Sequence, residues 1–62
     1  MNNAEKAFLY DEYIRESDVL QRSISRIKSE FAGNIPEVKV REIQLMEIRI
    51  NELVELLNKL YV

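Results

Sequence analysis

Apolar residues recur at spacings of three and four through both halves of the chain, with Ser17 as the one polar member of the pattern. This spacing is typical of a coiled-coil seam. It predicts two long amphipathic helices, over about 3–32 and 35–61. The first seam comprises Tyr10, Tyr13, Ser17, Leu20, Ile24, Ile27 and Phe31, and the second comprises Pro36, Val40, Ile43, Met46, Ile50, Leu53, Leu57 and Leu60.

The only glycine and the only proline of the chain, Gly33 and Pro36, lie between the two seams. Glycine suits the left-handed residue that ends a helix, and proline suits the first turn of a new one. Asn2 and Asn34 each stand three residues before a Glu, a spacing that favours capping of the free backbone N–H groups by the Asn side chain. We therefore expect a turn at 33–34, with Gly33, Asn34 and Pro36 as hinge residues. A linker of about two to four residues makes the helices antiparallel neighbours.

The two seams match each other across this turn. In antiparallel register the expected partners are Tyr10 and Leu57, Tyr13 and Leu53, Ser17 and Ile50, Leu20 and Met46, Ile24 and Ile43, Ile27 and Val40, and Phe31 and Pro36. Charge favours the same arrangement, because basic residues near the end of the first helix face acidic residues of the second. These are Arg22, Arg26 and Lys28 on one side and Glu37, Glu42 and Glu47 on the other.

The second helix has more apolar residues than one neighbour can cover. Outside its seam it carries Val38, Leu45, Ile48, Val54, Leu56 and Tyr61. A single packing partner needs an apolar stripe of roughly 100°, and these residues widen the stripe to about half the circumference. Three explanations are open: the core of a homodimer, a groove for a helix of another protein, or a monomer with an irregular surface. We favour a four-helix bundle of two hairpins packed through this helix.

Composition narrows the class of protein. The chain has 62 residues, no Cys and no His, and a net charge of −2 from 9 basic and 11 acidic residues. Disulfides and thiolate metal sites are excluded, and the commonest general base is absent. So small a chain buries little surface alone, which favours oligomerisation. The weak net charge does not favour nucleic acid, and no apolar run is long enough for a membrane span.

Candidate functional residues lie on the first helix and on the surplus apolar face of the second. Glu12, Glu16 and Asp18 form an acidic cluster, predicted on the outer face of the first helix, that is a candidate partner-binding face. Phe8 is an exposed aromatic residue and either a dimer contact or a partner anchor. No Ser has an activating His, so we predict no catalytic residue, no metal site and no cofactor. The residues expected to form a dimer or partner interface are Val38, Leu45, Ile48, Leu56, Tyr61 and Phe8.

Two resemblances bear on function. The plan of two helices and one tight turn resembles the plasmid copy-number regulator Rop, an antiparallel dimer that binds paired RNA hairpins; this implies an RNA-binding bundle. The segments Ile50-Asn51-Glu52-Leu53-Val54 and Ile43-Gln44-Leu45-Met46-Glu47 resemble the Ser-Gln-Glu-Leu-Asp signature of small sporulation phosphatases, which act on a response regulator. The first segment has Val in place of the essential Asp, and the second keeps only the Gln and a terminal acid.

These patterns together predict an all-α antiparallel two-helix hairpin that forms a homodimeric four-helix bundle. The favoured function is that of a small, non-enzymatic, cytoplasmic regulatory or adaptor protein that binds another protein through a helical face. The alternatives are a Rop-like RNA-binding bundle and a small hairpin phosphatase or inhibitor that acts on a signalling protein. No membrane association is expected.

Overall fold

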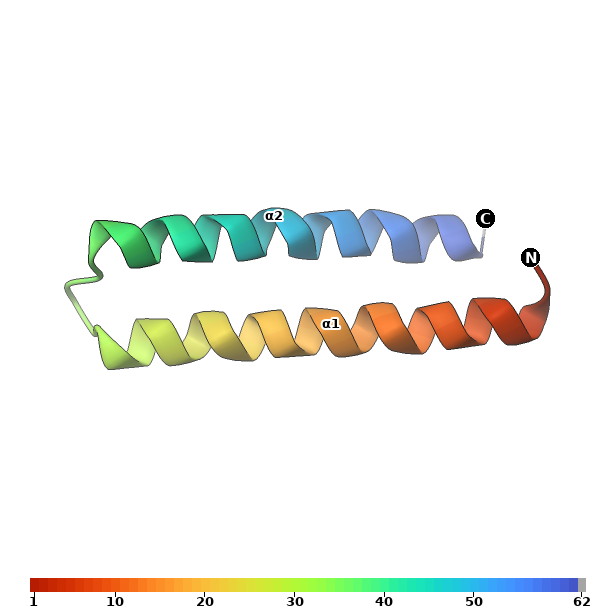
Figure 1. The fold of residues 1–62 in the computed structure, drawn as a ribbon, viewed down its shortest axis with the longest axis horizontal. Helices are drawn as coiled ribbons and strands as arrows, with labels where there is room; N and C mark the ends of the chain where they lie inside the picture. Colours follow the sequence, from red (N-terminus) through yellow and green to blue (C-terminus); the bar gives the residue numbers. More distant parts are fainter. Residues whose placement is uncertain (62) are drawn as a thin grey trace.

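Two antiparallel helices lie side by side in the computed structural model, which describes residues 1–61 (Figure 1). They are α1 (Asn3–Glu30) and α2 (Glu37–Leu60), and no strand occurs among these residues. The molecule is a rod with extents of 46 × 15 × 13 Å. The start of α1 and the end of α2 lie at one end of the rod and the linker at the other (Figure 1). The predicted all-helical hairpin is therefore confirmed.

The first helix begins as its sequence predicts. Asn2 is the N-cap residue, and its Oδ1 atom accepts a hydrogen bond of 2.8 Å from the backbone N–H of Glu5. This bond satisfies one of the free donors at the start of α1. Glu5 also supplies a negative charge in the first turn, where the helix dipole favours it.

The second helix begins differently. Pro36 is the N-cap residue of α2, and no side chain caps this terminus, so the predicted capping by Asn34 is wrong. The reason lies in Pro36 itself. A proline disfavours helical backbone in the residue before it, which keeps Ile35 out of the helix. The helix therefore starts after Pro36, two residues later than expected, and Asn34 lies too far back to reach its first N–H groups.

The linker covers residues 31–36 and is longer than the predicted two to four residues. It opens with a tight turn in which the N–H of Asn34 donates to the carbonyl oxygen of Phe31 at 2.9 Å. Gly33 has a φ of +83°, the left-handed conformation that other residues rarely adopt. A Cβ atom at this position would meet nothing within 4 Å. Backbone conformation, and not lack of space, is therefore what requires glycine here.

The core lies along the predicted seam. Leu53 has 0% of its surface exposed, and Ile27, Ile43 and Leu60 are also buried. Most other seam positions are half-buried, namely Tyr13, Ser17, Leu20, Ile24, Phe31, Met46, Ile50 and Leu57. Apolar contact between the helices is thus continuous but thin, because each helix covers only one side of the other.

The seam is less well covered near its ends. Tyr10, Val40 and Pro36 are exposed, although each was predicted to lie in the seam. Near the start of α2 the half-buried side chain is Lys39 instead of Val40. Counting back from Ile43 with coiled-coil spacing reaches Lys39, four residues earlier, whereas Val40 is displaced toward the flank of the helix. Val40 was assigned to the seam because it is hydrophobic, although its angular position on the helix favours the flank.

Candidate interaction surfaces

One ion-pair cluster joins the two helices. The Nε of Arg49 lies 2.6 Å from Oε2 of Glu16, and its Nη2 lies 3.2 Å from Oε1, so the guanidinium binds the carboxylate in a bidentate manner. Its Nη1 also donates to Glu52 at 3.0 Å. Hydrogen bonding from Arg49 lowers the pKa of Glu16 below its ordinary value, and the two carboxylates raise the pKa of Arg49. This cluster supports the predicted register, because Glu16 and Arg49 each adjoin a member of the expected pair Ser17 and Ile50.

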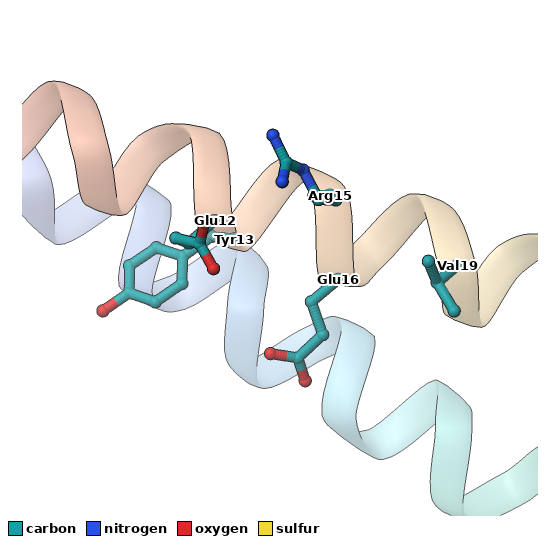
Figure 2. Close-up of a pocket in the computed structure, with 5 residues that line it drawn as sticks. All are labelled: Glu12, Tyr13, Arg15, Glu16 and Val19. Carbon is teal, nitrogen blue, oxygen red and sulfur yellow. The ribbon is translucent and has the colours of Figure 1, made fainter.

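The cluster corrects the predicted position of Glu16. Glu16 was expected on the outer face of the first helix, but it is half-buried and points toward α2 (Figure 2). It directly precedes the seam residue Ser17 and so occupies a flanking position of the heptad, from which side chains bridge to the neighbouring helix. Among residues 1–61, this is also the one ion pair between the helices, so the basic residues near the end of α1 and the acidic residues of α2 that face them form no ion pair with each other.

The other acidic candidates remain on the surface. Asp18 is exposed and pairs with Arg22 at 3.0 Å within α1. Glu12 is exposed and lines a shallow hollow of about 380 Å³ together with Tyr13, Arg15, Glu16 and Val19 (Figure 2). Every lining residue of this hollow comes from α1. The hollow is therefore open helix surface and not a cleft between elements.

An outer strip runs along α1 on the side away from the seam. Phe8, Glu12, Arg15 and Val19 are spaced by four, three and four residues, which places them on one face of the helix. Phe8 is 64% exposed, and Val19 is also exposed. In Figure 2 the side chain of Arg15 points away from α2. We refer to these four residues as the α1 strip.

A second strip lies on α2. At ~100° per residue, its members fall within about 80° of arc, well away from the seam. Three apolar members are largely exposed: Leu45 at 68%, Val38 at 67% and Ile48 at 56%. The strip, called the α2 strip below, comprises Val38, Arg41, Leu45, Ile48, Glu52 and the half-buried Leu56.

Tyr61 belongs to a different surface from the other predicted interface residues. Its ring meets that of Tyr10 edge to face, with centroids 6.1 Å apart. Ile14 follows Tyr10 by one helical turn, and Val54 precedes Tyr61 by two, so all four exposed side chains border the two helices on the same flank near the termini. Tyr61 thus already has a partner within its own chain, which its spacing from the seam did not predict.

Within residues 1–61 no group of three carboxylate, His or Cys side chains could hold a metal ion. Neither helix of this part of the chain is long and apolar enough to cross a bilayer. In the segment that resembles the phosphatase signature, Leu53 is fully buried in the core and Glu52 is bonded to Arg49.

Sequence reasoning missed Arg49 as the residue that connects the helices. Its signal was its heptad position, because Arg49 directly precedes the seam residue Ile50 just as Glu16 precedes Ser17. Flanking positions of this kind form ion pairs between coiled-coil helices.

Comparison with known proteins finds no family model, no curated protein and no solved structure that matches this chain.

Proposed function

We propose that the protein is a homodimeric four-helix bundle that acts as a small non-enzymatic regulator or adaptor, binding another protein through a helical face. The observation that carries this proposal is the contrast between core and surface. Four apolar side chains are buried in the hairpin, whereas large apolar residues are exposed along both helices. Large apolar patches on a protein surface mark sites of association.

The total surface supports association of two chains. The hairpin exposes 4900 Å². A compact monomer of 7.4 kDa has about 4,200 Å² on the general relation between surface and mass. The excess, about 700 Å², is close to the ~800 Å² that each partner buries in a standard protein interface.

Two strips on separate helices allow self-association and partner binding at the same time. The α2 strip is the more apolar of the two, and apolar surface is what homodimer interfaces bury. The α1 strip mixes Phe8 and Val19 with Glu12 and Arg15, and Asp18 lies beside it. An aromatic anchor with charged neighbours suits a reversible protein contact. We therefore assign the dimer to α2 and the partner to α1.

Sedimentation equilibrium at micromolar concentration tests the dimer. We expect twice the chain mass for the wild type and the single-chain mass for Leu45→Glu, Leu56→Glu, because two buried carboxylates on the α2 strip would be desolvated without partners. Ser29→Glu, at an exposed position of α1, is the matched control and should stay dimeric. A single-chain mass for the wild type would overturn the proposed assembly.

Affinity purification from the source organism, followed by mass spectrometry, tests partner binding. A specific partner should be retained by the wild type and by Ser29→Glu, and lost with Phe8→Glu or with the pair Glu12→Lys, Asp18→Lys. Retention by all variants would show that the α1 strip is not the binding face. Recovery of RNA whose binding weakens steeply with salt would instead favour an RNA-binding bundle.

A further inference from the structure

The α2 strip has a charge pattern that is complementary to itself when reversed. Along the helix its exposed residues run Val38, Arg41, Leu45, Ile48 and Glu52, and the half-buried Leu56 follows last. The apolar centre is thus flanked by a cation on one side and an anion on the other. We propose that a second copy of the chain packs its α2 antiparallel on this strip, with the two-fold axis passing between Met46 and Glu47. This inference rests on the proposed homodimer and specifies its geometry.

Antiparallel packing about that axis pairs every member of the strip. Leu45 meets the partner's Ile48, Val38 meets the partner's Leu56, and Arg41 meets the partner's Glu52. Two-fold symmetry repeats each contact, so the interface is isologous. At ~1.5 Å per residue, the contact from Val38 to Leu56 is about 27 Å long. This register departs by no more than one residue from exact antiparallel pairing.

Parallel packing is disfavoured by the same residues. It would set Arg41 against the partner's Arg41 and Glu52 against the partner's Glu52, and like charges in contact suppress association. In the antiparallel dimer, the charges alternate instead. Glu37 already pairs with Arg41 at 3.3 Å, and Glu52 with Arg49 and so with Glu16. The new contact between Glu52 and the partner's Arg41 joins these clusters into two symmetry-related networks of alternating charge, each of which spans three of the four helices.

Disulfide trapping tests the orientation, since the chain has no Cys of its own. In the antiparallel dimer, the double variant Arg41→Cys, Glu52→Cys should form a covalent dimer under mild oxidation. Arg41→Cys alone should not, because the Cys residues of the two chains are then about 16 Å apart along the helix axis. The double variant cannot close a bond within one helix, where the same spacing applies. Ser25→Cys on the exposed side of α1 controls for random collision. Non-reducing gel electrophoresis reads the outcome.

Charge exchange provides a second readout. Arg41→Glu and Glu52→Arg should each weaken the dimer at least tenfold. The double exchange should bind more tightly than either single variant, since opposite charges then meet again between the chains, although Glu37 and Arg49 then have like-charged neighbours within each chain. If the wild type is dimeric but Arg41→Cys alone is trapped, the packing is parallel and this inference fails while the proposed homodimer stands. A monomeric wild type would overturn both.

Discussion

Leu53 is the residue on which the hairpin depends most. Its side chain is fully buried, whereas the other three core residues retain some exposure. We expect Leu53→Ala to lower the free energy of unfolding by about 2–5 kcal/mol, the range for a large-to-small change that leaves a cavity. Val19→Ala, an exposed apolar position on α1, should change it by less than about 0.5 kcal/mol. Urea unfolding followed by circular dichroism at one protein concentration compares the two. Equal losses would contradict the assigned core.

Glu16 connects stability to pH at the scale of a single carboxyl group. Hydrogen bonding from Arg49 lowers its pKa in the folded state below the ordinary 4.5. A carboxyl with a depressed pKa stabilises the fold above its unfolded pKa, and this contribution disappears as the pH falls through the lower, folded value. We therefore expect the wild type to lose stability below about pH 4.5, and Glu16→Gln to lose less over the same range. Glu12→Gln, at an exposed position with no ion pair among the described residues, should retain the wild-type profile.

Residue positions were predicted well where the pattern is periodic and less well at its edges. The buried residues Ile27, Ile43, Leu53 and Leu60 all belong to the predicted seam. Glu16 and Val40 were placed wrongly because residue type was weighed above heptad angle: an acid was assumed to face solvent and a valine to face the neighbour. A flanking carboxylate turns inward when an arginine lies opposite, and that information resides on the other helix.

At the scale of the helices, the two N-termini differ in how they are capped. Asn2 makes a side-chain cap bond and Asn34 makes none to α2. We expect Asn2→Ala to destabilise the hairpin by about 1 kcal/mol, the usual loss for an N-cap. Asn34→Ala should have an effect below about 0.5 kcal/mol. Thermal unfolding of both variants under the same conditions measures these losses of stability. An equal loss for the two variants would indicate that Asn34 also caps a helix.

The existence, order and approximate length of the helices could be read from the sequence, because Gly33 and Pro36 interrupt two otherwise unbroken periodic segments. The linker length could not. It depends on the exclusion of Ile35 from helical conformation by Pro36. The spacing of Asn34 and Glu37 suits a capping box, but the proline between them prevents Asn34 from capping the helix. The turn thus lies where it was predicted, but the linker extends over residues 31–36.

For the whole molecule, association predicts a melting temperature that depends on concentration. If folding and dimerisation are coupled, a tenfold increase in protein concentration should raise the melting temperature by about 5 °C for two chains of this size. Leu45→Glu, Leu56→Glu should show a lower melting temperature with no such dependence. Calorimetry over a hundredfold concentration range distinguishes these outcomes. A wild-type melting temperature that does not change with protein concentration would indicate that the hairpin folds as a stable monomer.

The surface strips illustrate where prediction from sequence stops. The surplus apolar residues of α2 were identified from their angular spread, and Val38, Leu45 and Ile48 are indeed exposed in the hairpin. Spacing alone did not show that Tyr61 is drawn to Tyr10, since such a contact depends on two long side chains at the ends of both helices. Nor does spacing along one chain specify a partner, because binding depends on a second surface.

The position of the termini has a consequence for how the rod can be used. The start of α1 and the end of α2 lie at the same end of the rod, opposite the linker, so a single hairpin is directional: the linker end is its head and the other end its tail (Figure 1). An antiparallel pair removes that direction, since the head of each copy lies toward the tail of the other. Anything attached to either terminus would then be displayed in duplicate at opposite ends, as on a spacer, whereas a parallel pair would gather all four ends into one cluster.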